Sequence, residues 1–184
     1  MEIELTDLWL PIVVSGVVIH ILSTLAWMVL PHHKGDWGKL SDEDGFMNSV
    51  RDLSIKPGNY MFPYHQSKEE MNSPKFQKKW DEGPKGTIIL FDTVNMGKNI
   101  LCTISFFFVA SFCLAYLCTM ADLTRESDFM AVFRFVGTAG ILTYCAAGIP
   151  NSIWFKHKIG MNILDGIAYA LATAAIFGWL WPSS

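Results

Sequence analysis

The chain has 184 residues, of which 51% are hydrophobic and 17% are charged, with a formal net charge of −3. The charged fraction lies below the roughly 25% that is usual for soluble domains, and the small net charge does not indicate a nucleic-acid partner. None of the four cysteines belongs to a C-x-x-C pair. We therefore expect buried packing thiols and neither a zinc site nor a disulfide framework.

An apolar segment from Leu8 to Leu30 predicts a first transmembrane helix, in a region 1–30 that begins with a short acidic tail. At about 1.5 Å per residue such a helix covers a hydrocarbon core about 30 Å thick. The segment lacks the basic flank of a signal peptide, so we expect it to remain in the protein. His20, near its middle, is a candidate cofactor ligand or proton relay. The alternative is a histidine that packs by hydrogen-bonding a neighbouring helix.

Residues 31–97 carry most of the ionisable side chains and predict a cytoplasmic cap folded against the end of a bundle. Capping residues and apolar spacing indicate short helices over 42–54 and 73–81. Residues 59–64 are expected to be extended. The short apolar run 87–91 is either a strand or a segment at the membrane surface, because periodicity cannot separate the two.

Residues 98–184 predict three further transmembrane helices, over about 99–120, 129–149 and from near Gly160 to the end. Pro150 is expected to end the third of these. Small residues repeat every four positions on the last helix, which predicts close helix packing in lipid. The residues expected to pack helices in this way are Gly140, Gly148, Gly166, Ala170, Ala174 and Gly178. The predicted fold is an all-α integral membrane protein, a four-helix bundle with a small cytoplasmic cap between helices one and two.

The distribution of basic residues predicts the orientation. Of the 14 lysines and arginines, ten lie between Lys34 and Lys98 and two more in the third connection, against Arg125 and Arg134 on the other side. Cytoplasmic loops carry the excess of positive charge. We therefore expect both termini in the periplasm and residues 31–97 in the cytoplasm.

Four residues of the cap are candidates for a metal site of imidazole and carboxylate type: His32, His33, His65 and Asp36. No helical ligand spacing accompanies them, and adjacent histidines are expected to point in different directions. The alternative is an interfacial turn that positions the cap.

Asp165, near the start of the last helix, is expected to lie close to the membrane interface. It is predicted to pair with Lys156, Lys158 or a histidine of the cap. The alternative is a carboxylate that handles protons.

Four stretches together resemble a family of small four-span bacterial membrane proteins: Pro31 to Lys34 with Asp36-Trp37, GNYMFP from Gly58, Gly83 to Gly86, and the tail DGIAYALATAAIFGWLWP. The resemblance covers nearly the whole chain, and its tail is the most specific part. It implies a bacterial cytoplasmic (inner) membrane. It brings no activity, cofactor or catalytic residue to transfer.

Three functions follow from these features. The leading prediction is a non-catalytic accessory, structural or assembly subunit of a larger bacterial membrane complex, for example a respiratory or photosynthetic one, with lipid, other subunits or a second copy as partners and no cofactor. It depends on abundant small-residue and aromatic packing surface. The second is a metal- or haem-binding redox protein that uses His20 or His32 and His33. The third is a small transporter or channel, which the lack of internal repeats disfavours.

Overall fold

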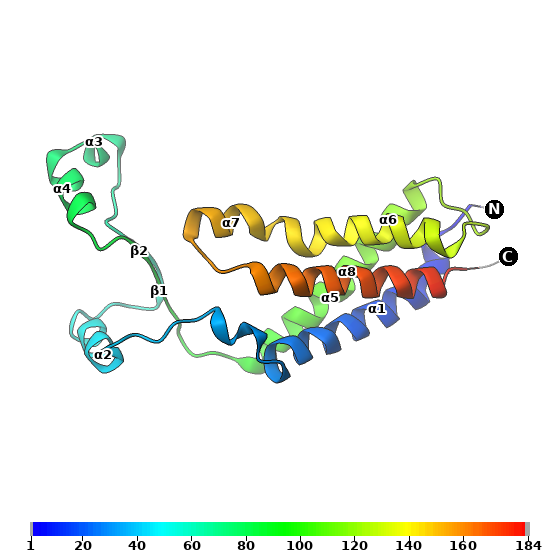
Figure 1. Cartoon of the computed structure of the whole chain (residues 1–184), viewed down its shortest axis with the longest axis horizontal. Helices are drawn as coiled ribbons and strands as arrows, with labels where there is room; N and C mark the ends of the chain where they lie inside the picture. Colours follow the sequence, from blue (N-terminus) through cyan, green and yellow to red (C-terminus); the bar gives the residue numbers. More distant parts are fainter. Residues whose placement is uncertain (1, 183–184) are drawn as a thin grey trace. The chain divides into compact units, whose positions relative to one another are not determined.

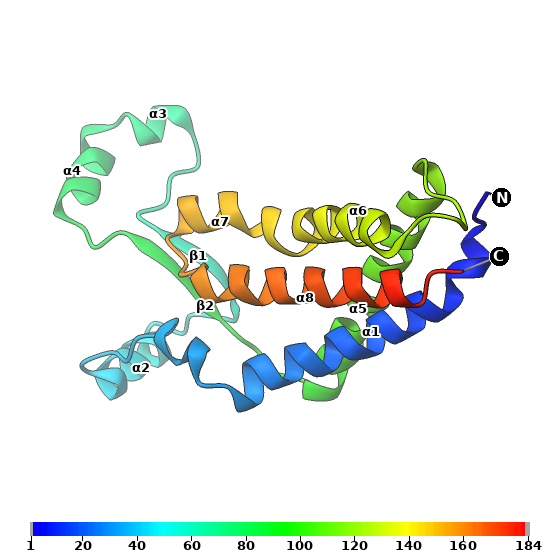
Figure 2. The same cartoon turned by 45° about the vertical axis from the view of Figure 1, so that its right-hand side comes forward.

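The computed structural model describes residues 2–182. It separates into two compact units, one made of Met1–Trp37 and Asn95–Ser184 and the other of Gly38–Val94. The first unit is a bundle of long helices and the second, here called the middle unit, is a small mixed fold (Figures 1 and 2).

Among residues 2–182, the bundle contains four helical stretches that are long and apolar enough to cross a membrane. The first combines a 3-10 turn, an α-helix and a π-helical end: η1 (Leu5–Leu8), α1 (Trp9–Thr24) and η2 (Leu25–Val29). The second is α5 (Met96–Met120). The third joins α6 (Phe129–Ile141), η4 (Leu142–Ala146) and α7 (Gly148–Phe155), and the last is α8 (Gly160–Trp179).

The prediction that Pro150 ends the third helix is wrong, because helical structure continues to Phe155. The π-helical segment η4 and a turn at Ala147 interrupt the helix first, and α7 then begins anew at Gly148. Pro150 thus lies in the first turn of α7, where backbone N–H groups have no partner within the helix. Its missing N–H costs nothing there.

Small residues bring α6 and α8 together, and Figures 1 and 2 show the two helices side by side. A Cβ atom added at Gly140 would lie 3.0 Å from the Cβ of Ala170. Ala170 and Ala174 are fully buried. A Cβ at Gly178 would lie 2.6 Å from the Phe129 ring. The small side chains of α8 are therefore used within the bundle, where close approach of the backbones holds helices together.

Gly148 differs from the other small residues that the sequence singled out. Its added Cβ would lie 3.2 Å from the side chain of Ile159, in the connection between α7 and α8. Its neighbour is thus a connecting segment and not a second span.

The outward face of α1 is apolar. Trp9, Val13, Val17 and Ile21 repeat every four residues and are all exposed. On the inner side, Leu8, Leu114, Val132 and Phe177 are fully or almost fully buried in one apolar cluster. A bundle that is apolar both in its core and on its outer surface is suited to a lipid environment.

The expectation of buried thiols holds for only two of the four cysteines. Cys118 and Cys145 are buried, whereas Cys102 and Cys113 lie exposed on α5. Cysteine behaves as a small hydrophobic side chain. It therefore suits the apolar outer surface of the bundle as well as the core of the bundle.

The middle unit is not all-α. It contains α2 (Glu43–Asp52), β1 (Gly58–Phe62), α3 (Lys68–Met71), α4 (Pro74–Glu82) and β2 (Gly86–Leu90). The two strands pair antiparallel, with Tyr60 opposite Ile88. The helices predicted over 42–54 and 73–81 are confirmed, and the run 87–91 is resolved as a strand. The run forms a strand because it pairs with the extended segment β1. The sequence of the short run alone did not distinguish a strand from a segment at the membrane surface.

Candidate metal centre

The turn after the first helix places two histidines. Leu30 is extended, as expected of a residue that precedes proline, and Pro31 begins the 3-10 turn η3 (His32–Gly35). Two backbone bonds of 3.0 Å hold this turn, from the Lys34 N–H to the Pro31 carbonyl and from the Asp36 N–H to the His33 carbonyl. The tight turn brings the rings of His32 and His33 to 4.3 Å between centroids, at 40° to each other.

The carboxylate that meets them comes from α8. Asp165 begins a buried stripe that continues at Tyr169, Thr173 and Phe177, each four residues further on. Positions four apart share one face of a helix, and this face of α8 packs into the bundle. Asp165 is therefore buried at the end of an otherwise uncharged inner face.

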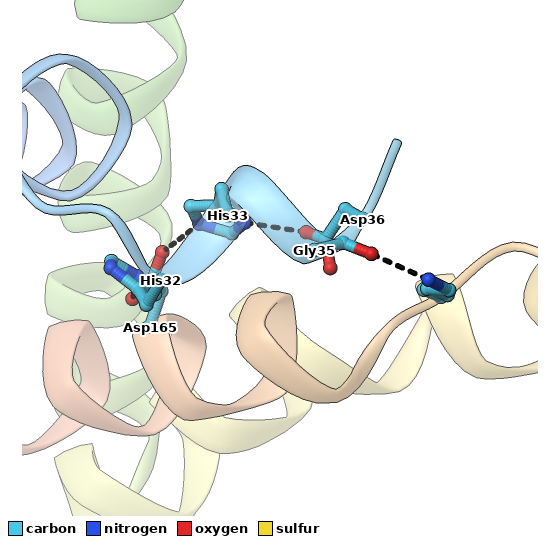
Figure 3. A network of polar contacts seen from close by, with 6 residues as sticks. His32, His33, Gly35, Asp36 and Asp165 are labelled. Atoms are coloured by element: carbon cyan, nitrogen blue, oxygen red, sulfur yellow. Dashed lines mark hydrogen bonds and ion pairs between the residues drawn. The ribbon is translucent and has the colours of Figure 1, made fainter. Parts of the chain in front are cut away.

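Each carboxylate oxygen of Asp165 meets one histidine (Figure 3). The Nε2 atom of His32 lies 3.0 Å from Oδ1, and the Nε2 atom of His33 lies 2.8 Å from Oδ2. The other ring nitrogen of His33, Nδ1, lies 2.7 Å from an oxygen of Asp36. One buried histidine is thus bracketed by two carboxylates, while the second shares one of them.

These contacts define the charge of His33. A carboxylate oxygen accepts a hydrogen bond, so the contacts of both ring nitrogens of His33 with carboxylate oxygens favour the doubly protonated, cationic ring. Burial disfavours that cation, but the hydrogen bonds and charges of Asp36 and Asp165 outweigh it and raise the pKa of His33 above its ordinary value. The positive ring partly neutralises two acidic side chains that would otherwise repel each other.

Two further contacts fix the turn. The indole of Trp27 stacks on the imidazole of His33, with centroids 3.8 Å apart and planes within 9°. Stacking on an aromatic face favours a cationic ring. Lys158, in the connection before α8, donates a hydrogen bond to the carbonyl of Gly35. The turn is therefore held from the first helix and from the last connection.

The same three side chains form a ligand set. One ligand atom each from His32, His33 and Asp165 lie within 4.8 Å of one another. Ligands on a tetrahedral ion at about 2.0–2.1 Å lie roughly 3.3 Å apart, which is close to the nitrogen-to-oxygen distances seen here. Two imidazoles and one carboxylate suit a divalent transition metal. Asp36 on the far nitrogen of His33 is the outer partner that metal-bound histidines usually have.

Of the four metal candidates from the sequence, the structure brings three together: His32, His33 and Asp36. The expectation that the adjacent histidines point apart is wrong, because the 3-10 turn aims both Nε2 atoms at one carboxylate. His65 belongs to the middle unit, where its ring packs edge-on against Phe76 at 5.3 Å between centroids.

Asp165 was expected to pair with a lysine or a histidine, and it pairs with two histidines. Its place among the ligands was missed. An acidic residue in an apolar helix was the only sign of it in the sequence. The stacking of Trp27 on His33 was not predicted either, and no pattern in the sequence indicates it.

His20 lies away from this cluster, in the C-terminal half of α1. Its ring is 6.4 Å from that of Phe107 between centroids, and its Nδ1 atom is buried with no hydrogen-bond partner among residues 2–182. The same holds for four buried hydroxyls inside the bundle, those of Ser15, Ser111, Tyr144 and Tyr169.

Comparisons of the chain with protein-family models, with curated proteins and with solved structures found no match.

Proposed function

We propose that this protein binds a divalent transition metal at the end of its helix bundle, with His32, His33 and Asp165 as ligands. The observation that carries the proposal is the convergence of three ligand atoms from the first and last helical regions within 4.8 Å. Asp36 supports it, because it holds the Nδ1–H of His33 and leaves Nε2 to face the ion.

His32, His33 and Asp165 would hold the ion. The Nε2 atoms of both histidines would first give up their protons to solvent, because only a deprotonated imidazole nitrogen binds a metal. His33 would keep its hydrogen bond from Nδ1 to Asp36. With only three protein ligands, a bound metal would be able to polarise a water or a substrate, as the metal of a catalytic site does.

The location that we propose is a bacterial inner membrane, crossed by four helices. Both ends of the bundle hold polar groups that suit the membrane surfaces. Arg125 pairs with Asp7 at the end where the first helix begins, and the histidine cluster lies at the other end of α1. The excess of lysines and arginines in the segments that connect the first helix to α5 and α7 to α8 supports a cytoplasmic position for the metal centre and periplasmic termini.

The test is the metal content of the full chain, purified without a histidine tag. Wild type is stripped with a chelator, loaded in turn with Zn²⁺, Mn²⁺, Fe²⁺, Co²⁺ and Ni²⁺, and analysed for bound metal. We expect about one ion per chain for at least one of these metals, and loss of that ion in Asp165→Asn and in His33→Ala.

Asp122→Asn is the matched control, because Asp122 is an exposed acid in the hairpin before α6. It removes the same charge without touching the cluster and should keep the ion. A wild type that holds none of the five metals would overturn the proposal. The cluster would then be the interfacial turn that the sequence offered as the alternative.

The accessory-subunit function stays a prediction. The small-residue ladder that motivated it packs α8 against α6 and η4. The transporter or channel also stays a prediction, and the metal centre is the function for which the side-chain geometry offers direct support.

A further inference from the structure

Two adjoining cavities lie beside the histidine cluster, in the same compact unit. One has a volume of about 340 Å³ and is walled by Trp27, Asp36, Trp37, Lys156, His157 and Asn162, together with Lys158. The other measures about 310 Å³ and shares His157, Lys158 and Asn162 with the first. Each falls at the lower end of the range of small-molecule sites, about 300–1,000 Å³.

The walls of these cavities carry more positive than negative charge. Lys156 and Lys158 are cationic, and Asp36 is the acidic residue among the lining side chains. The carboxylate of Asp36 is compensated by the bond from His33 at 2.7 Å. Lys158 uses one of its three donors on Gly35 and keeps the others. An anion in the first cavity would therefore meet two ammonium groups, and one in the second would meet that of Lys158, with no unpaired acid among the lining residues.

Hydrogen-bond donors surround these charges. Asn162 and His157 line both cavities, and Asn151 and Ser152 line the second. Several donors around two point charges suit a tetrahedral group with many acceptor oxygens. A planar carboxylate is more often held by the fork of an arginine, and the lining residues include none.

We propose that these cavities bind a phosphate group, carried either by a phospholipid headgroup or by a soluble phosphate compound. Lys156 and Lys158 supply the charge, and Asn162 and His157 supply directional hydrogen bonds. Trp27 and Trp37 wall the first cavity with indole rings, side chains that favour the headgroup level of a bilayer. The site goes beyond the proposed metal centre and does not require it.

The experiment uses the full chain, stripped of metal with a chelator and held in dodecyl maltoside, a detergent without phosphate. Binding of radiolabelled inorganic phosphate is measured by equilibrium dialysis. In parallel, nanodiscs of mixed phosphatidylcholine and phosphatidylglycerol are analysed by native mass spectrometry for the lipid retained on the protein. We expect Lys156→Gln to lower the affinity for whichever ligand binds by at least tenfold.

Lys34→Gln is the matched control, since Lys34 is exposed on the neighbouring turn and lines neither cavity. It should bind as wild type does. Asp165→Asn should also keep phosphate binding, which separates failure of this site from failure of the metal centre. Circular dichroism on each variant establishes that it is folded.

The two measurements distinguish a soluble phosphate ligand from a phospholipid headgroup. Saturable binding of inorganic phosphate that Lys156→Gln weakens supports a soluble ligand. Selective retention of phosphatidylglycerol that the same variant abolishes supports a headgroup. If neither ligand binds to wild type, or if folded Lys156→Gln binds as well as wild type, the proposal is wrong.

Discussion

Asp165 lies 2.8 Å from the Nε2 atom of His33, although 132 positions separate the two residues in the chain. The contact joins the turn after the first helix to the first turns of the last. A buried histidine between carboxylates is an expensive arrangement to assemble, because each group must give up its hydration. Such arrangements concentrate where a protein needs shifted proton affinities or metal ligands.

The outer partner of the metal centre can be tested separately from its ligands. We expect Asp36→Asn to lower the affinity for the metal about 10–100-fold, because the carboxylate orients His33 and increases the basicity of its Nε2 atom. Competition with a chromogenic chelator measures the dissociation constant. Asp122→Asn should leave it unchanged. If Asp36→Asn bound the metal as tightly as wild type does, Asp36 would have no role in the metal site.

Gly166 should be intolerant of a methyl group. A Cβ atom there would lie 2.6 Å from the Sγ of Cys145 and 3.0 Å from the carbonyl oxygen of Tyr144. Because the second neighbour is backbone, α8 must move, and overpacking of this kind costs about 1–3 kcal/mol. We expect Gly166→Ala to unfold at a lower temperature in detergent.

The control for that change is Gly160→Ala, because nothing lies within 4 Å of an added Cβ there. It should melt at the temperature of wild type or slightly above, since alanine favours helix. Equal melting temperatures for the two alanine variants would contradict the close contact between α8 and η4.

Ala174 tests the centre of the ladder. It is fully buried, and a Cβ added at Gly137 would lie 3.5 Å from its own. Ala174→Leu should destabilise the bundle by about 1–3 kcal/mol, measured as a lower midpoint in detergent unfolding. Ala168→Leu makes the same change on the exposed face of α8 and should be neutral. If the small-residue face of α8 pointed to lipid, Ala168→Leu would be the less stable of the two variants.

The orientation in the membrane can be read by cysteine labelling. With the four native cysteines replaced by alanine, single cysteines are placed at exposed Glu126 and exposed Asn72. A maleimide that cannot cross the inner membrane should label Glu126→Cys in cells with a permeable outer membrane. Asn72→Cys should react only after lysis. The opposite pattern would invert the topology.

Sequence reasoning was sufficient for the long helices because their signal is local. An apolar run of about twenty residues predicts a spanning helix without knowledge of its partners, and Gly160 marked the start of α8. It failed at Pro150 for a reason that is also local, since η4 interrupts the helix just before the proline. Nothing in the composition of residues 142–146 distinguishes a π-helix from an α-helix.

The metal centre was only partly predictable. His32, His33 and Asp36 stood out because they lie together in the chain, but the direction of their side chains depends on the 3-10 turn. Asp165 stood out as a charge in an apolar helix, and its partner is set by which face of α8 packs inward. That face is a property of the assembled bundle, so a single helix does not reveal it.

The wide separation of His33 and Asp165 in the chain also sets the order in which the centre can arise during synthesis. The ribosome finishes both histidines long before it reaches the carboxylate. A nascent chain that stops before α8 therefore carries the nitrogen ligands without their acidic counterpart. Under the proposed function, the chain therefore binds the metal only after α8 has been inserted. A bound ion then indicates that α8 has packed against the first helix.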